Sequence, residues 1–209
     1  TKVQKIIRDN KTLILSNGEK CTYDKLILCT GSHPIRLTDS LGGNLSSLYY
    51  VRSIEDADMM TVEFQKGKKV LIIGGGYIGL EVAAVASKME VNTTLVEASD
   101  RILQRVASKE TSDYFRKLHT LNGVNIIEGV KLRNLEGKNG KVIGANLSDG
   151  SQVDIDFVVA GIGIRPNQIL AEEADLEIEN GIKVNEFCQT SDPNIFAAGD
   201  CASFPFNNE

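Results

Sequence analysis

The feature that most constrains the fold of this chain is a glycine-rich turn between an apolar strand and a helix. Residues 69–73 (KVLII) are mostly apolar and partly β-branched, a composition that favours a buried strand. The run Gly74–Gly79 (GGGYIG) follows with the spacing G-x-G-x-x-G. A helix is predicted over residues 80–89 and a second strand over residues 93–96. This order predicts a βαβ unit with a parallel sheet.

Each glycine of the turn has an expected role in binding a dinucleotide. Gly74 permits the tight turn, Gly76 lets the backbone approach a pyrophosphate, and Gly79 lets helix and strand pack closely. The helix N-terminus near Tyr77 offers free N–H groups and a positive dipole end to the phosphates. Glu97, at the end of the second strand, is expected to accept hydrogen bonds from the adenosine ribose. The alternative interpretation is a purely structural βαβ turn.

Two arginines follow Glu97 at a spacing of four residues. Arg101 and Arg105 are interpreted either as contacts to adenine or phosphate or as part of a solvated basic face. The sequence leaves these two interpretations equal.

An internal repeat shows that the chain contains a second region of similar design. Residues 16–34 (SNGEKCTYDKLILCTGSHP) align without a gap to residues 148–166 (SDGSQVDIDFVVAGIGIRP) at an offset of 148 − 16 = 132 positions. Both copies hold a turn glycine, an acidic residue, an apolar strand, a glycine and a proline. The matched pairs are Ser16/Ser148, Gly18/Gly150, Asp24/Asp156, Gly31/Gly163 and Pro34/Pro166. The repeat predicts two nucleotide-binding halves, of which the first has no glycine turn within this sequence.

The remaining elements are read from hydrophobic periodicity and turn residues. The predicted order is an α/β fold, in which a Rossmann-like domain with a parallel sheet carries an antiparallel β-meander. Remnants of a second domain of the same design accompany it. Strands are predicted at 3–7, 12–15, 25–29, 158–160, 182–184 and 195–198, with several more between 124 and 159, and helices at 54–64, at 109–121 and near 168–174.

Composition excludes several classes of function. Lys plus Arg total 23 and Asp plus Glu total 28, so the net charge of −5 gives no general attraction to nucleic acid. The 4 cysteines form no CxxC pair, and with 2 histidines no zinc-site spacing occurs. No signal peptide or membrane span is expected. Sparse, unpaired cysteines favour a cytoplasmic location.

The cysteines and histidines are expected to be structural. Cys29 and Cys188 are predicted in the core, and Cys201 is predicted to serve packing. His33 is expected in a turn beside a proline, and His119 on the surface of a helix.

A further informative segment ends an apolar strand at a glycine and an aspartate. In residues 190–202 (TSDPNIFAAGDCA), Gly199 would let backbone come close to a ligand, and Asp200 could hold a sugar-like hydroxyl group. A plain exit from strand to turn explains the segment equally well.

Together these segments resemble the FAD- and NAD(P)H-dependent pyridine nucleotide-disulphide oxidoreductases. The resemblance rests on VLIIGGGYIGLEVAA, on CTGSHP and GIGIRPN, and on SDPNIFAAGDCA. Two further stretches, LYYVRSIEDA and RILQRVASKETSDYFRKLHTLNGVNI, resemble the ferredoxin reductase branch, which includes rubredoxin and putidaredoxin reductases. The resemblance covers essentially the whole chain.

The resemblance implies NAD and FAD as cofactors, held by defined residues. NAD would be bound by Gly74, Gly75, Gly76, Tyr77, Ile78, Gly79, Glu97 and Arg105, with Glu81, Ile162 and Gly163 near the nicotinamide. Arg52 and Asp200 would contact FAD, and Thr30, Gly31 and Gly199 complete the expected set. Hydride transfer between these cofactors needs no side-chain acid or base, so no catalytic residue and no metal site is expected.

The resemblance also implies a domain division and an activity. Residues 1–47 would be part of an FAD-binding domain, 48–165 the NAD(P)-binding domain, and 166–209 a segment returning to the first domain. The chain would be a fragment that lacks the family's FAD phosphate loop and C-terminal domain. Its parent would pass electrons from NADH through FAD to an iron–sulfur protein such as ferredoxin or rubredoxin.

Three alternatives to this function remain. The sequence does not determine the oligomeric state. The isolated chain could be an inactive NAD-binding module. The parent could instead be a disulfide reductase or an NADH oxidase with its redox cysteine in a missing N-terminal part. A flavin-free dehydrogenase is disfavoured, because no proton carrier has suitable spacing and the repeat implies a second domain.

Overall fold

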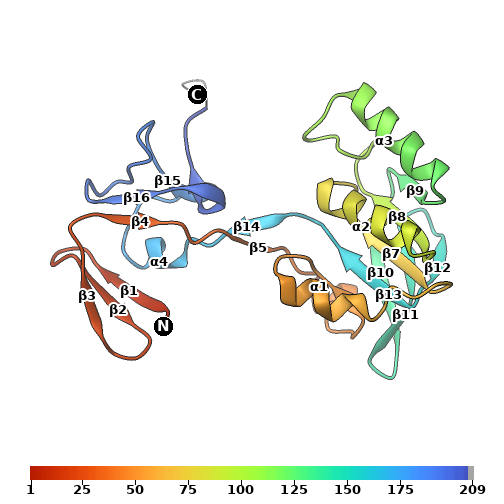
Figure 1. Cartoon of the computed structure of the whole chain (residues 1–209), viewed down its shortest axis with the longest axis horizontal. Coiled ribbons are helices and arrows are strands. Elements are labelled where there is room, and N and C mark those ends of the chain that lie inside the picture. Colours follow the sequence, from red (N-terminus) through yellow and green to blue (C-terminus); the bar gives the residue numbers. More distant parts are fainter. Residues whose placement is uncertain (207–209) are drawn as a thin grey trace. The chain divides into compact units, whose positions relative to one another are not determined.

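The computed structural model describes residues 1–206 and divides into two compact units (Figure 1). Among the described residues, unit 1 consists of residues 1–33 and 164–206, and unit 2 of residues 34–163. The boundary predicted between residues 47 and 48 differs from this division, which groups residues 34–47 with unit 2, and the assignment of FAD- and NAD(P)-binding domains stays a prediction. The end of the predicted return segment, residues 207–209, lies outside the described residues.

The elements alternate as an α/β chain. The strands are β1 (Val3–Ile7), β2 (Thr12–Leu15), β3 (Lys20–Thr22), β4 (Leu26–Leu28), β5 (Ser32–Pro34), β6 (Leu48–Tyr49), β7 (Lys69–Ile73), β8 (Asn92–Glu97), β9 (Asn125–Glu128), β10 (Leu132–Lys138), β11 (Lys141–Leu147), β12 (Gln152–Asp154), β13 (Phe157–Ala160), β14 (Ile164–Pro166), β15 (Ile182–Lys183), β16 (Ile195–Ala197) and β17 (Ala202–Ser203). The α-helices are α1 (Ile54–Thr61), α2 (Tyr77–Lys88), α3 (Lys109–Leu121) and α4 (Ile169–Glu172), and the short 3-10 segments are η1 (Asp39–Leu41) and η2 (Gly199–Cys201).

Unit 2 is built on a five-stranded parallel sheet in the order β6-β13-β7-β8-β9. The central strand β7 buries both faces, as its unbroken apolar run requires. Val70 and Ile72 pack with α2, whereas Leu71 and Ile73 pack with the antiparallel sheet β10-β11-β12. The predicted Rossmann-like sheet with its β-meander is confirmed.

Unit 1 holds the antiparallel sheet β1-β2-β3 and two parallel strand pairs, β4 with β16 and β15 with β17. Its core contains Leu28, Ile182, Ile195 and Cys201, all buried. Strand β16 returns from the end of the chain to pair with β4 near its start, so the two ends of the sequence fold together.

The internal repeat is reproduced in the hydrogen bonds of the two units. In unit 1 the Leu15 amide donates to the Glu19 carbonyl at 2.9 Å, and in unit 2 the Leu147 amide donates to Ser151 at 2.9 Å. The hairpins β2-β3 and β11-β12 thus close in the same register at the predicted offset. The sequence repeat therefore corresponds to a repeat in the structure, which a chance similarity between two unrelated hairpins would not explain.

Three expectations about the burial of single residues are wrong. Cys29 lies just beyond β4 and is exposed, because the strand buries Leu28 instead. Cys188 is also exposed. His119 is 7% exposed, because it follows Phe115 by one helical turn on the core-facing side of α3, and burial lowers the pKa of its imidazole.

Of the two remaining predictions, the one for Cys201 is confirmed, whereas the turn predicted at His33 is wrong because Ser32–Pro34 forms the strand β5, paired with β14. Cys201 is buried, and its thiol donates to the Leu28 and Ala198 carbonyls at 3.3 Å. His33 is exposed in β5 beside the side chain of Asn167, at 2.6 Å.

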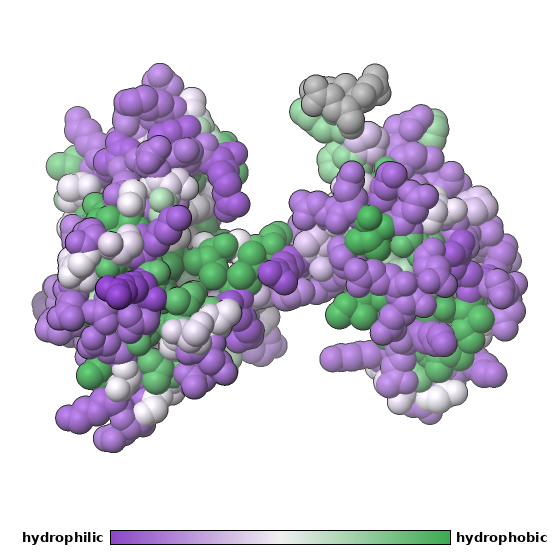
Figure 2. Space-filling model, turned by 180° about the vertical axis from the view of Figure 1, so that it is seen from behind, coloured by the Kyte–Doolittle hydropathy of each residue, from purple (hydrophilic) through white to green (hydrophobic). Residues whose placement is uncertain are grey.

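The face in Figure 2 is largely hydrophilic, with apolar residues gathered in smaller patches on each unit. Among residues 1–206, no helix combines the length and apolar character needed to cross a membrane.

Candidate nucleotide-binding site

The glycine turn leads from β7 into α2 and is held by the neighbouring strand ends. The Gly74 amide donates to the Val96 carbonyl of β8 at 2.8 Å. Gly74 has φ +105°, and a Cβ there would press on the carbonyl oxygen of Gly161. Only glycine tolerates both the backbone angle and this close approach.

The other two glycines of the motif face different surroundings. A Cβ at Gly79 would collide with the carbonyl oxygen of Gly74, so this glycine serves the close packing of α2 on the turn. A Cβ at Gly76 would meet no atom within 4 Å. The fold itself therefore does not require glycine at Gly76, and the open space beside it fits the approach of a ligand phosphate.

The N-terminus of α2 opens on this space. Gly76 is its N-cap and makes no side-chain capping bond, so the first-turn N–H groups keep no such partner among residues 1–206. Tyr77 is 59% exposed and Ile78 is 39% exposed. The helix dipole and these N–H groups suit a pyrophosphate, so the residues present fit a dinucleotide.

Glu97 lies at the end of β8 and holds the turn from its other side. One carboxylate oxygen accepts the Gly75 amide at 2.6 Å, and the other accepts the Ser99 amide at 2.7 Å. A carboxylate has about four lone-pair positions, so two remain for hydroxyl donors. Glu97 thus fixes the glycine turn and can still accept bonds from a ribose.

The segment after β8, residues 98–108, packs against the glycine turn, and the sequence did not predict this contact. The Leu103 amide donates to the Gly75 carbonyl at 2.9 Å. A Cβ at Gly75 would lie 2.6 Å from the side chain of Ile102. No periodic pattern marks residues 98–108, and only their position after a strand-terminal glutamate could have pointed to this role.

The two arginines of this segment differ. Arg101 turns its guanidinium inward, donating to the carbonyls of Gln104, Ala107 and Ser108 and to the Ser112 hydroxyl. Its interpretation as a nucleotide contact is therefore not supported. Arg105 is exposed and stays a candidate.

Two of the three residues expected near the nicotinamide, Ile162 and Gly163, follow β13. The Gly161 amide donates to the Ile73 carbonyl at 2.8 Å, which holds the turn containing Ile162 and Gly163 next to the glycine turn. Glu81 is exposed on α2, one helical turn beyond Tyr77. The structure therefore brings the 161–163 turn and the start of α2 together.

Residues expected at FAD are divided between the units. Thr30, Gly31, Gly199 and Asp200 lie in unit 1, whereas Arg52 is exposed in unit 2 just before α1. Asp200 accepts a hydrogen bond from the buried Ser32 at 2.8 Å.

The segment containing Thr30 and Gly31 is held by Asn167, which the sequence did not single out as a site residue. The Thr30 hydroxyl donates to the Asn167 carbonyl at 2.6 Å, and the Asn167 amide donates to Gly31 at 2.9 Å. The only signal for Asn167 is its place directly after the repeat proline, Pro166.

The site chemistry is binding and orientation. Within residues 1–206 no group of His, Cys, Asp or Glu side chains could hold a metal ion. The glycine turn, the open helix N-terminus and Glu97 offer hydrogen-bond donors and acceptors that suit phosphate and hydroxyl groups. The reactive atoms would come from bound cofactors.

Comparison with known proteins places this site in context. Residues 1–208 match the pyridine nucleotide-disulphide oxidoreductase family. The chain is 41% identical to putidaredoxin reductase of Pseudomonas putida, over 98% of this chain and 49% of that protein. It is 39% identical to a monodehydroascorbate reductase of Arabidopsis thaliana, over 94% of this chain and 40% of that protein. A crystal structure of a covalent putidaredoxin reductase–putidaredoxin complex matches with a TM-score of 0.93 and 40% identity, covering 99% of this chain and 50% of that chain.

The chain thus spans about half or less of the length of these relatives. The match extends over both units and includes the glycine turn and the segment ending at Asp200. On this match, the chain belongs to the pyridine nucleotide-disulphide oxidoreductase family.

Proposed function

We propose that this chain supplies the NADH-binding part of an FAD-dependent reductase that passes electrons from NADH to an iron–sulfur protein. The observation that carries the proposal is the glycine turn, whose Gly76 faces open space while Glu97 stands at the neighbouring strand end. The similarity to putidaredoxin reductase supports the iron–sulfur acceptor. A cytoplasmic location belongs to the same proposal.

The chain's own residues would bind and orient the nucleotide. The α2 N-terminus would receive the pyrophosphate, and Glu97 would accept the ribose hydroxyls. The 161–163 turn, next to the glycine turn, would support the nicotinamide. Bound FAD would supply the redox chemistry, accepting a hydride and releasing single electrons.

In unit 1, Asp200 and Ser32 are the residues that would hold FAD hydroxyl groups. They fit only part of that cofactor, because the sequence has one G-x-G-x-x-G turn and it lies in unit 2. The longest helix described in unit 1 is α4, at 4 residues.

The isolated 209-residue chain is therefore expected to bind FAD weakly or not at all. A dinucleotide pyrophosphate needs a glycine turn and a helix N-terminus, which unit 1 does not offer among its described residues. Gel filtration after incubation with FAD should give a colourless protein peak. Stoichiometric flavin absorbance in that peak would contradict this expectation.

The electron acceptor is tested on the whole FAD-loaded protein that contains this chain. Because NADH supplies two electrons, one NADH oxidised should reduce two one-electron iron–sulfur proteins. Parallel assays offer a ferredoxin, a rubredoxin, monodehydroascorbate, a disulfide and oxygen. If NADH oxidation reduces monodehydroascorbate, the disulfide or oxygen but neither iron–sulfur protein, the proposed acceptor is wrong.

A second candidate function has a specific observation in its favour. The similarity to the Arabidopsis thaliana monodehydroascorbate reductase is close to that of the putidaredoxin reductase, at 39% against 41%. A small organic radical is therefore the rival acceptor in that assay. Both functions use the NADH site in the same way.

A further inference from the structure

Two carboxylates at adjacent strand ends bind backbone amides of the glycine turn and of the segment that follows β8. Glu97 ends β8 and Glu128 ends β9, and the two residues are register partners in the sheet. Glu97 accepts the Gly75 and Ser99 amides. Glu128 accepts the Ile102 amide at 2.8 Å. The first part of the segment after β8 is therefore held at Ser99 and at Ile102 by carboxylates from the sheet.

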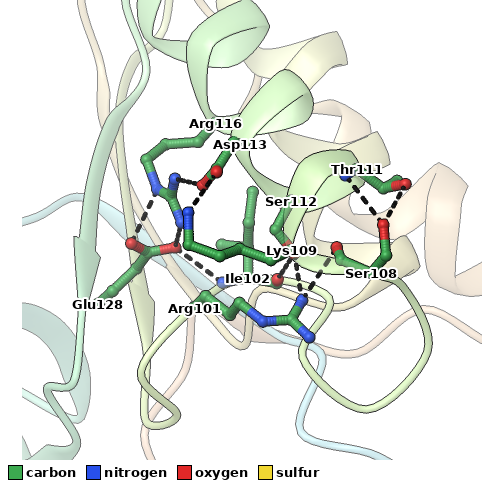
Figure 3. Close-up of polar contacts among 9 residues, drawn as sticks. All are labelled: Arg101, Ile102, Ser108, Lys109, Thr111, Ser112, Asp113, Arg116 and Glu128. Carbon is green, nitrogen blue, oxygen red and sulfur yellow. Dashed lines mark hydrogen bonds and ion pairs between the residues drawn. The ribbon is translucent and has the colours of Figure 1, made fainter.

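The charge of Glu128 is balanced by Arg116 of α3. The guanidinium makes a bidentate contact with both Glu128 oxygens, at 2.8 and 2.9 Å (Figure 3). These bonds to Glu128, and one to Asp113, raise the pKa of Arg116. The pair is half-buried, with Glu128 19% and Arg116 32% exposed, so the geometry is fixed and only partly screened by water.

Arg101 fixes the interior of the same segment. Its guanidinium gathers three carbonyls, those of Gln104, Ala107 and Ser108, and also reaches Ser112. The Ser112 hydroxyl is fully buried and donates to the Ile102 carbonyl at 2.6 Å. Figure 3 shows Arg101 and Glu128 on either side of Ile102, joined through these contacts.

This network reaches the glycine turn through two neighbouring residues. Ile102 packs over Gly75, and the Leu103 amide donates to the Gly75 carbonyl. Leu103 has φ +56°, a backbone angle that a leucine keeps only when surrounding contacts impose it. Loss of the Arg101 contacts would release that angle and with it the bond to Gly75.

We propose that Arg101 and Glu128 are positioning residues, which set the affinity for NADH by holding segment 101–107 against Gly75. Neither residue contacts the nucleotide in this proposal. They act through Ile102 and Leu103 on the turn that receives the pyrophosphate. The proposal rests on the proposed function of the Gly74–Gly79 turn in binding NADH.

The test measures NADH affinity and amide exchange in the full 209-residue chain. Arg101→Ala is expected to raise the Kd for NADH by about tenfold. It should also speed hydrogen exchange in peptides covering residues 101–107. Arg101→Lys keeps one donor group and should give an intermediate Kd. Arg133→Ala removes the same charge from an exposed position on β10 and is the matched control.

The binding measurement separates positioning from general stability. A residue that only stabilises the fold would lower the melting temperature and leave the Kd, measured well below it, unchanged. The ratio of NADH to NADPH affinity should stay constant in Arg101→Ala, because Glu97 is retained. If Arg101→Ala does not fold, Glu128→Gln tests the same network, since it removes the charge that holds Arg116.

The outcomes distinguish this inference from the proposed function. A wild-type chain that binds NADH, with a variant Kd within twofold of it and unchanged exchange over 101–107, overturns the positioning role alone. A wild-type chain that shows no NADH binding overturns the proposed function and this inference with it.

Discussion

A Gly76→Ala variant is expected to keep the stability of the wild type and to lose at least about tenfold in NADH affinity. The added Cβ meets no protein atom within 4 Å, and Gly76 has φ −80°, which alanine readily adopts. The methyl group would instead occupy the space into which the pyrophosphate must come. Titration with NADH and thermal unfolding measure the two effects on the same sample.

Gly79→Ala is the matched control with the opposite behaviour. Its Cβ would collide with the Gly74 carbonyl oxygen, so α2 must move away from the turn. Overpacking of this kind costs about 1–3 kcal/mol and should lower the melting temperature by about 2–12 °C. Equal loss of stability in both variants would show that the space at Gly76 is not a ligand site.

Glu97→Ala is expected to shift the preference between the two nicotinamide nucleotides. The wild type should favour NADH over NADPH by about 10- to 100-fold, or about 1.4–2.7 kcal/mol. The Glu97 carboxylate would accept a hydrogen bond from the ribose 2′-hydroxyl of NADH and would repel the 2′-phosphate of NADPH. The structure strengthens this expectation, because Arg101 is engaged inside its own segment and only Arg105 remains to offset the repulsion.

The ratio of affinities, measured by titration with each nucleotide, is the decisive quantity for Glu97. Glu97→Ala also removes the acceptor of the Gly75 and Ser99 amides, and this loss should weaken both nucleotides alike. Only the loss of the carboxylate from the ribose changes the ratio. Asp100→Ala removes the same charge from an exposed neighbour and should leave the ratio unaltered. An unchanged ratio in Glu97→Ala means that Glu97 is not the selector.

The fold was predictable where local pattern and long-range packing agree. β1, β2, β7 and α3 have the predicted bounds, because apolar periodicity and turn residues mark both ends of each. α2 begins at Tyr77 rather than at residue 80, since Gly79 disfavours a helix locally and is accepted for its close packing.

Other elements carry no local signal. The strands β5, β14 and β17 have 2 or 3 residues each, too few for a periodic pattern. Their pairing is set by segments distant in the sequence, as with β17, which pairs with β15. The division into units carries no local signal either, because residues 34–47 join unit 2 through long-range contacts such as the hydrogen bond from the Leu37 amide to the Tyr50 hydroxyl.

The binding motif of the candidate site was predictable from the sequence, but the hydrogen-bond network that supports it was not. The glycine turn and Glu97 follow from their spacing, because the chemistry of phosphate and ribose binding demands those residue types. The roles of Arg101, Glu128 and Ser112 depend on side-chain directions that spacing does not reveal. His119 is buried because it lies on the face of α3 that packs on the core, and tertiary packing rather than local sequence determines which face that is.

Amide exchange during an NADH titration of the intact chain tests most directly whether the Gly74–Gly79 turn binds NADH. We expect saturable binding, with slowed exchange concentrated at the glycine turn, at the start of α2 and around Glu97. Residues 1–33 and 195–203 should show no comparable change. Absence of saturation, or protection confined to those unit 1 segments, would show that the glycine turn is not the NADH site.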